Sequence, residues 1–194
     1  MAHSQSLVPK IFEEKFYNGA QDRLNRLGLN PLMDGIRGIV TGFPLLVKEA
    51  TDANGGAAVR TLLDQRFDIP TGWTKKQTGD VDWSKCLSLD GARVCIGVEI
   101  QFSARSDLVV IDHIHLRKAI VQGKIDVGVL IVPSDRLGVF LTDRGPKMAD
   151  AKRHVIEAKV EDLPLVLISL EHDGPGPPLA KQMKRRMRTE GSAS

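Results

Sequence analysis

The dipeptide Asp90-Gly91 constrains the fold of this chain most, because it separates two runs in which apolar and polar residues alternate. An Asp-Gly pair in that setting favours a two-residue β-hairpin, whose type I′ turn needs positive φ at both central residues. Residues equally distant from the turn then lie opposite one another. We therefore predict that Asp82 lies opposite Glu99, and Asp80 opposite Gln101.

The second face of the hairpin supports this register. A slip of one residue would send every side chain to the other face. With the turn at Asp90-Gly91, mostly apolar residues face one another in the pairs Trp83 with Val98, Lys85 with Ile96, Leu87 with Val94, and Leu89 with Ala92, and Ile100 and Phe102 continue the stripe. One face is therefore predicted to pack into a core, while small and polar groups surround the two acids on the other.

Asp82 and Glu99 would be close enough to share a cation. Cβ atoms of opposite residues lie about 4.5–5.5 Å apart, and like charges at that distance destabilise a sheet unless a cation neutralises them. The alternative is an exposed sheet edge that merely carries acids. Against it, the Glu99 strand precedes a predicted crossover helix and a parallel strand, so it should lie inside the sheet with its polar face partly covered.

The chain after the hairpin has a βαβ pattern. Residues 106–122 have helical composition and Gly123 follows as a stop, while the apolar run at 125–133 suits a central strand. The crossover should be right-handed and the two strands parallel. The remaining predicted elements are a short strand at 137–142, a helix at 146–159 and a buried strand at 163–170.

The first 70 residues are predicted to be mainly helical. Apolar residues recur near every 3.6 positions over residues 9–28, and a helix at 57–67 is ended by Ile69-Pro70. Asn30-Pro31 is typical of a helix start, but the glycines that follow predict a broken helix there.

The length and the composition fit one globular domain. The 194 residues are 42% hydrophobic and 26% charged, which is ordinary for a folded protein. We expect a single domain over residues 1–172, with residues 71–172 as its core. Residues 173–194 are expected to form a Pro/Gly linker and a basic tail, which is either a solvated segment or one attracted to nucleic acid.

Charge and cysteines set weaker limits. The net charge of +3 permits a polyanionic partner without requiring one. Cys86 and Cys95 lack the CxxC spacing of zinc sites. They face one another in the hairpin register, yet we expect two reduced thiols. The chain shows neither a secretory signal nor a membrane-spanning run, so we expect a cytoplasmic protein with no membrane partner.

An aspartate on one hairpin strand followed by Glu-x-Lys on the next is the pattern of the PD-(D/E)xK nucleases, which this chain resembles. Gln101 stands where that pattern has lysine, and Glu-x-Gln is similar to the type II restriction endonucleases related to BglII and BstYI. "VEIQFSARSDLVV" and "IDVGVLIVP" look like the corresponding parts of that group. The resemblance covers about residues 72–133 and implies an α/β fold, with a mixed central sheet flanked by helices.

The resemblance also implies roles for the site residues. Asp82, Glu99 and the backbone carbonyl of Ile100 would hold Mg²⁺, a hard cation that prefers oxygen ligands. Gln101 would take the place of the family lysine and orient the attacking water or contact the scissile phosphate. Hydrolysis would leave 5′-phosphate ends.

Further residues are candidates with weaker support. An upstream acid or amide would complete the site, and the candidates are Glu49, Asn54 and Asp64, with Asp90 retained in case the turn lies elsewhere. Candidate DNA contacts are Lys75, Lys76, Ser103 and Arg105. The crossover-helix residues His113, His115, Arg117 and Lys118 are expected to be solvated or to lie at an interface, and two histidines two positions apart on a helix do not face each other.

The sequence favours a homodimeric type II restriction endonuclease that cleaves duplex DNA at a short palindrome, since two-fold protein symmetry matches a two-fold site. By resemblance, the helices before residue 70 would form the dimer. Two alternatives are a different PD-(D/E)xK nuclease, acting in repair or on modified DNA, and an inactive DNA-binding or assembly protein. The recognition sequence cannot be read from the chain.

Overall fold

The computed structural model describes residues 10–69, 72–76, 81–103, 105–142 and 145–181. The strands are β1 (Lys10–Phe16), β2 (Leu46–Val47), β3 (Thr74–Lys75), β4 (Trp83–Leu89), β5 (Ala92–Ile100), β6 (Val127–Pro133), β7 (Leu165–Glu171) and β8 (Gly174–Pro175). The helices are α1 (Ala20–Arg26), α2 (Asn30–Thr41), α3 (Gly56–Asp68), α4 (Val109–Val121), α5 (Asp135–Phe140) and α6 (Met148–Glu157), with a 3₁₀ turn at Ser106–Leu108.

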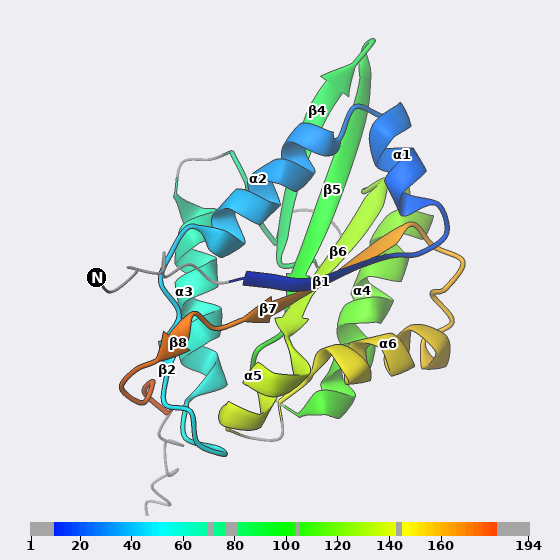
Figure 1. Cartoon of the computed structure of the whole chain (residues 1–194). Helices are drawn as coiled ribbons and strands as arrows, with labels where there is room; N and C mark the ends of the chain where they lie inside the picture. The colour runs from blue at the N-terminus through cyan, green and yellow to red at the C-terminus, as the bar shows by residue number, and fades with distance from the viewer. Residues whose placement is uncertain (1–9, 70–71, 77–80, 104, 143–144, 182–194) are drawn as a thin grey trace, which may run out of the picture.

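Within the described residues, six strands form one mixed sheet in the order β1-β7-β6-β5-β4-β3. The central strands β5, β6 and β7 run parallel, while β1, β4 and β3 pair antiparallel with their neighbours (Figure 1). The sheet confirms the predicted α/β class, with a mixed central sheet flanked by helices.

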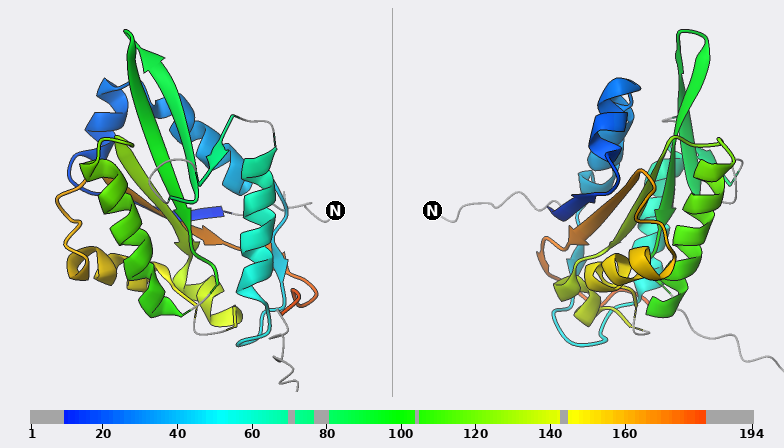
Figure 2. Two further views of the ribbon diagram at one scale, coloured as in Figure 1. Left: turned by 180° about the vertical axis from the view of Figure 1, so that it is seen from behind. Right: turned by 90° about the vertical axis from the view of Figure 1, so that its right-hand side faces the viewer.

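Helices cover the two faces of this sheet. One core packs α1, α2 and α3 against residues such as Ile100, while the other packs α4 and α6 against residues such as Leu130. Figure 2 shows α1 and α2 on one side of the sheet and α4 on the other. Because successive side chains alternate, Glu99 lies on the α4 side of β5 when Ile100 lies on the α3 side.

The hairpin register is as predicted. Trp83 pairs with Val98 and Leu89 with Ala92, and the turn residues Asp90 and Gly91 have φ of 49° and 81°. The pairing of Asp80 with Gln101 lies outside the described residues. The far end of the hairpin projects beyond the rest of the sheet (Figures 1 and 2).

The βαβ unit is also confirmed. α4 connects β5 to β6, which pairs parallel with β5 and places Glu99 beside Leu130. Gly123 has φ of 67° directly after the helix. β5 lies between β4 and β6, so the Glu99 strand is internal and the exposed-edge alternative is wrong.

The predicted helix at 9–28 is wrong over its first half. Residues 10–16 form β1, which pairs with the outer edge of β7, and the helix α1 begins only at Ala20. Asn18 and Gly19 have φ of 45° and 65°, so the chain turns between the two elements. Pairing with a sheet edge far away in the sequence outweighs the local 3.6-residue pattern.

The predicted break after Asn30-Pro31 is wrong as well. α2 is continuous, with Leu32, Met33, Ile36 and Val40 buried along one side. Glycine costs a helix interior about 1 kcal/mol relative to alanine. Burial of this apolar side against the core offsets that cost.

The predicted strand at 137–142 is instead the helix α5 over residues 135–140. β6 ends at Pro133, and the Ser134 hydroxyl then accepts the Leu137 backbone N–H at 3.0 Å. A serine N-cap of this kind satisfies one of the free N–H groups of a first helical turn. The Ser134 cap therefore favours a helix, and not a strand, directly after β6.

Residues 173–181 are not a coreless linker. β8 pairs parallel with β2, and the Leu179 backbone N–H donates to Asn54 Oδ1 at 3.1 Å. The remainder of the predicted basic tail, residues 182–194, lies outside the described residues. Among the described residues, none of the helices has both the length and the apolar composition that a bilayer span needs.

Candidate active site

The structure brings Asp82 and Glu99 together at the base of the hairpin. Asp82 directly precedes β4, and its Oδ2 accepts the Ile100 backbone N–H at 3.0 Å. The two carboxyl groups also share a hydrogen bond. Their residues are only 8% and 2% exposed, so this is a buried acid pair.

Arg60 of α3 closes one side of the acid pair. One of its guanidinium nitrogens lies 2.8 Å from Asp82 Oδ1, and another donates to the Ile100 carbonyl. Its Nε donates to Asp64 Oδ2 at 3.1 Å, one helical turn along α3. A fixed positive charge therefore lies where the resemblance implies metal ligands.

A close approach between α3 and the end of β5 places Arg60 there. A Cβ built on Gly56 would lie 1.9 Å from the Phe102 carbonyl oxygen, so a larger residue would push the start of α3 away from this chain segment. Gly56 thus allows the contact that holds Arg60 against Asp82.

On the other side of the acid pair, α4 contributes Asp112 and His115. His115 Nδ1 lies 3.2 Å from Glu99 Oε1. Ligand atoms of Glu99, Asp112 and His115 all lie within 4.8 Å of one another, which is a spacing that could hold a metal ion. Residues three apart on a helix share a face.

The expectation of a solvated or interface position is wrong for His113, while His115 is partly exposed but contacts Glu99. His113 is fully buried, with its Nε2 3.1 Å from the Ala151 carbonyl oxygen, and burial lowers the pKa of its imidazole to about 4. His115 lies over Glu99. Arg117 and Lys118 are exposed, as expected.

Burial and charge separate the pKa values of the three acids. Burial raises the pKa of Glu99 to about 11, and the nearby Asp82 charge adds to this. Burial and, secondly, the Asp82 charge raise the pKa of Asp112 to about 7. Burial acts in the same direction on Asp82, but its hydrogen bonds, first of all with Arg60, lower its pKa below the usual value. Asp82 is therefore the charged member of the pair at neutral pH.

The donor set fits a divalent cation. Asp112 Oδ2 is buried and has no hydrogen-bond partner among the described residues. Buried polar atoms are nearly always paired. A bound cation would satisfy this oxygen and would lower the free-energy cost of ionising Glu99 and Asp112 together.

Gln101 follows β5 immediately and is half-buried. Its backbone N–H donates to the Ile131 carbonyl at 2.9 Å, which continues the pairing with β6. Strand alternation puts residue 101 on the same face as Glu99. The Ile100 carbonyl, predicted as a metal ligand, accepts from Arg60.

Some of the other predicted residues lie beside the acid pair. Asp64 accepts from Arg60 and from the Trp83 indole at 2.9 Å, and Lys75 Nζ lies 3.8 Å from Asp64 Oδ2. The Lys76 backbone N–H donates to the Asp82 carbonyl at 3.0 Å. Asp64, Lys75 and Lys76 therefore surround the α3 side of the pair.

Ser103 and Arg105 follow Gln101 at the end of β5. Ser103 is half-buried, and the Arg105 guanidinium is highly exposed and paired with Asp107 at 3.0 Å.

Glu49, Asn54 and Asp90 have other partners. Glu49 contacts His172 and Arg136 at 2.7 and 2.9 Å. Asn54 is buried and bonds the backbone of three segments, including the Phe140 carbonyl. Asp90 makes the turn, and β4 separates it from Asp82 by roughly 25 Å at about 3.3 Å per residue.

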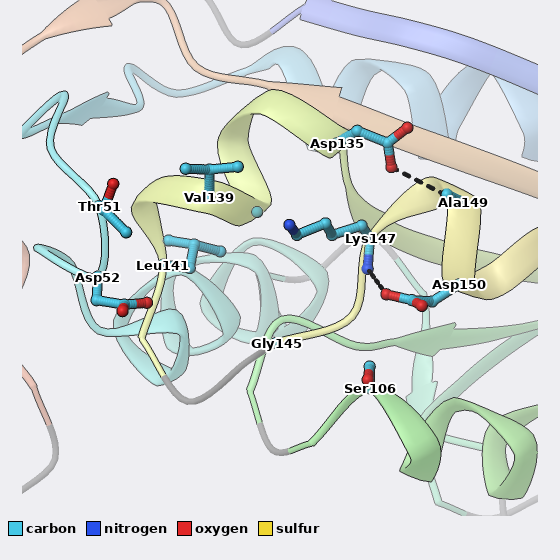
Figure 3. Close-up of a pocket in the computed structure, with 11 residues that line it drawn as sticks. Thr51, Asp52, Ser106, Asp135, Val139, Leu141, Gly145, Lys147, Ala149 and Asp150 are labelled. Carbon is cyan, nitrogen blue, oxygen red and sulfur yellow. Dashed lines mark hydrogen bonds between the residues drawn. The ribbon is translucent and has the colours of Figure 1, made fainter.

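A cavity of about 550 Å³ lies beside α5 and α6, and its lining includes Asp52, Asp135, Asp150, Ser106 and Lys147. Figure 3 shows that Asp135 and Asp150 accept backbone N–H groups, those of Ala149 and Lys147, at 2.9 and 3.3 Å. None of the acid-pair residues lines it. Its charged lining residues are three aspartates and one lysine, which is unfavourable for a phosphate group.

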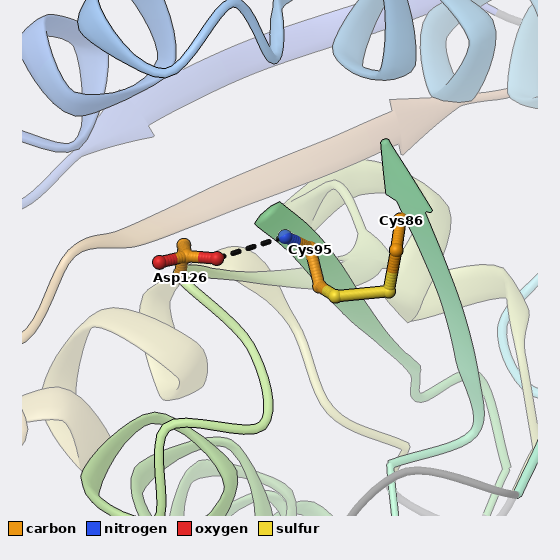
Figure 4. The surroundings of a disulfide bond; sticks show 3 residues. All are labelled: Cys86, Cys95 and Asp126. Carbon is orange, nitrogen blue, oxygen red and sulfur yellow. Dashed lines mark hydrogen bonds between the residues drawn. A yellow bond between two sulfur atoms is a disulfide. The ribbon is translucent and has the colours of Figure 1, made fainter. Parts of the chain in front are cut away.

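Cys86 and Cys95 are joined by a disulfide, so the expectation of two reduced thiols is wrong. They lie directly opposite one another on β4 and β5, with Cα atoms 4.0 Å apart. Figure 4 shows the bond across the hairpin and Asp126 accepting the Cys95 backbone N–H at 2.8 Å. In the predicted register of β4 and β5, the two cysteines are paired, and this places their sulfur atoms close enough to bond.

Sequence reasoning missed Arg60, Asp112 and His115. The available signals were spacings: Arg60 lies four residues before Asp64, and Asp112 lies three before His115, so each pair shares a helix face. What the sequence did not show was which helix face meets the acid pair.

Comparison with known proteins agrees with this geometry. A search of curated proteins finds no match. The family model described as restriction endonuclease BglII/BglIII matches residues 12–170, which is most of the chain and includes all the elements that form the acid pair. The chain belongs to the BglII/BglIII family of restriction endonucleases, nucleases that cleave DNA at specific sites.

Proposed function

We propose that this protein is a homodimeric type II restriction endonuclease, a Glu-x-Gln member of the PD-(D/E)xK nucleases similar to BstYI. It would hydrolyse duplex DNA at a short palindrome and leave 5′-phosphate ends. The observation that carries the proposal is the buried Asp82–Glu99 pair, which lies at the base of the hairpin within the region matched by the restriction endonuclease family.

The proposed ligands of the catalytic Mg²⁺ are Asp82, Glu99 and the Ile100 carbonyl. A bound Mg²⁺ would make a water nucleophilic near neutral pH and stabilise charge on the phosphate. Arg60 now donates to two of these ligands. Its guanidinium must therefore turn aside, and it can keep the Asp64 carboxylate, at 3.1 Å from its Nε, as a partner.

Gln101 is proposed to orient the attacking water or to contact the scissile phosphate. A neutral amide donates and accepts hydrogen bonds but carries no charge. It cannot stabilise the phosphate as an ammonium would. Positive charge near the phosphate would come instead from Arg60 and Lys75, which both lie beside Asp64.

Lys75, Lys76, Ser103 and Arg105 are proposed DNA contacts. Lys75 and Arg105 have exposed side chains, 49% and 78% respectively, at the two ends of the acid-pair region. Contacts of this kind fix the position of DNA without reading its sequence. Arg105 would exchange Asp107 for a phosphate.

The dimer is proposed to use α4. Ile111, Ile114 and Val121 on this helix are 42%, 48% and 69% exposed, although they are apolar. Their spacings of three and seven residues place them along one side of the helix. This observation favours α4 over the helices before residue 70. A single nuclease domain over residues 1–172 remains our proposal for the chain.

Cleavage of a long plasmid tests the proposal. The purified protein with Mg²⁺ should give discrete bands that disappear with EDTA and in Glu99→Ala. Glu157→Gln, which changes an exposed acid on α6, should cleave like the wild type and serves as the matched control. A smear would indicate a nonspecific nuclease, and binding without cleavage would indicate an inactive DNA-binding protein; either result contradicts the proposal.

A further inference from the structure

The two sides of Glu99 are neutralised differently. On the α3 side, the Asp82 carboxylate already has partners for both oxygens: Arg60 at 2.8 Å and the Ile100 N–H at 3.0 Å. On the α4 side, Asp112 and His115 approach Glu99, whose Oε1 lies 3.2 Å from His115 Nδ1. The Arg60 guanidinium thus contacts Asp82 directly, whereas Glu99 contacts an imidazole on the α4 side.

The α4 side has the chemistry of a metal site. Its three candidate ligand atoms come from two carboxylates and an imidazole and lie within 4.8 Å of one another. Glu99 is almost fully buried, and β5 fixes its backbone between two paired strands. Asp112 and His115 lie one helical turn apart on α4, so the helix presents both to Glu99.

The unpaired oxygen of Asp112 is an independent observation. Asp112 Oδ2 is inaccessible to solvent, yet no hydrogen-bond donor reaches it within the described part of the chain. Leaving a buried acceptor unsatisfied has a free-energy cost. A positively charged group between Asp112 and Glu99 would remove this cost.

We propose that Glu99, Asp112 and His115 form a second divalent-cation site, separate from the proposed Mg²⁺ ligands Asp82 and Ile100. Glu99 belongs to both sites. The imidazole distinguishes this site from an all-oxygen site, since imidazole ligands suit transition metals such as Zn²⁺, Fe²⁺ and Ni²⁺ better than Mg²⁺. Mn²⁺ is used below as a paramagnetic probe of the site. The catalytic meaning of the site rests on the proposed function, but its existence as a metal site does not.

Mn²⁺ binding measured by electron paramagnetic resonance tests this site on the full chain. The wild type should bind Mn²⁺, and the electron spin echo of the bound ion should show coupling to an imidazole nitrogen. His115→Ala should lose that coupling, and both His115→Ala and Asp112→Asn should weaken binding at this site at least about 10-fold, since metal-site substitutions commonly cost that much.

Two controls separate this site from its neighbour. Asp82→Asn should retain the nitrogen coupling, because Asp82 is not one of the three ligands. Glu157→Gln should bind Mn²⁺ as the wild type does. Absence of nitrogen coupling in the wild-type protein would overturn the proposal, even if the variants failed to fold.

The outcomes also separate the two proposals. Mn²⁺ bound through His115 without any plasmid cleavage would support this site and contradict the proposed nuclease function. Plasmid cleavage together with unchanged Mn²⁺ binding in His115→Ala and Asp112→Asn would support the nuclease and overturn this site.

Discussion

The two helices that meet the acid pair do opposite things. α3 supplies a guanidinium that pairs with Asp82, while α4 supplies an acid and an imidazole that add ligands beside Glu99. On the α3 side, the Arg60 guanidinium balances the charge of the Asp82 carboxylate without any bound cation. On the α4 side, burial and the Asp82 charge oppose ionisation, and they therefore raise the pKa of Glu99 and Asp112.

The comparison shows how one hairpin can position two acids in different protonation states. Asp82 and Glu99 face one another across the same ladder, and the helices packed on either side decide which of them ionises. Separated pKa values in neighbouring acids are common at functional sites, where each acid has a different task. The following variants test the two sides separately.

Glu99→Gln should have the largest effect, because Glu99 belongs to both sides. We expect plasmid cleavage to fall by about 10³-fold or more, equivalent to about 4 kcal/mol of transition-state stabilisation. The free energy of unfolding at pH 7 without metal should rise by about 1–3 kcal/mol, since wild-type Glu99 must take up a proton on folding at this pH and a neutral amide avoids that cost. Urea unfolding in EDTA measures this, and a lower stability would contradict the pKa argument.

Arg60→Met should disrupt the α3 side. It leaves the Asp82 carboxylate buried without its counter-charge, and we expect a loss of about 2–4 kcal/mol in the free energy of unfolding. Urea unfolding of Arg60→Met, Asp82→Asn and the double variant measures the coupling between the two. If the losses of the single variants simply add, the ion pair contributes nothing.

Asp112→Asn should change the α4 side in a pH-dependent manner. The pKa of Asp112 is raised to about 7 in the folded protein, so its contribution to stability is present at low pH and is lost as pH rises from about 4 to about 7. The amide cannot ionise. Without metal, the variant should therefore gain on the order of 4 kcal/mol relative to wild type over this range.

Thermal or urea unfolding at pH 4, 5.5 and 7 in EDTA checks the Asp112 prediction. Asp34→Asn, which changes an exposed acid on α2, is the matched control and should follow the wild-type profile. A constant difference between Asp112→Asn and wild type across these pH values would show that Asp112 has an ordinary pKa.

Gln101→Ala should have the smallest effect on folding and a moderate one on activity. Gln101 is half-buried at the end of β5, so we expect less than about 0.5 kcal/mol in stability. If its amide orients the water or the phosphate, kcat should fall by about 10–100-fold, with little change in DNA binding. Single-turnover cleavage and a DNA-binding titration separate the two quantities. Wild-type kcat in this variant would remove Gln101 from the proposed mechanism.

Local patterns predicted the parts of the fold that depend on neighbours in sequence. The Asp-Gly turn set the hairpin register, and the strand–helix–strand order predicted the parallel pairing of β5 and β6. Residues 10–16 and 135–140 were mispredicted because distant partners or a cap decide them. β1 pairs with β7, about 150 residues away, and Ser134 caps α5 at the end of a strand.

The candidate site divides in the same way. The facing of Asp82 and Glu99 follows from the hairpin register, whereas Arg60, Asp112 and His115 depend on which helix face meets the sheet. Helix spacing showed that Asp112 and His115 share a face of one helix. It did not show which residues of the sheet this face contacts. The disulfide was mispredicted although its geometry was recognised, since cross-strand facing permits the bond without deciding the redox state.

The sequence by itself therefore determined the hairpin, its two faces and the meeting of two acids, because turn chemistry and strand alternation act over a few residues. Only the tertiary structure decided that Arg60 lies against Asp82 and that Asp112 and His115 lie against Glu99. Helix packing sets those contacts, and it depends on the fit of whole surfaces, such as the close approach of Gly56 to Phe102. The shared hairpin pairs the acids, and the packed helices distinguish them.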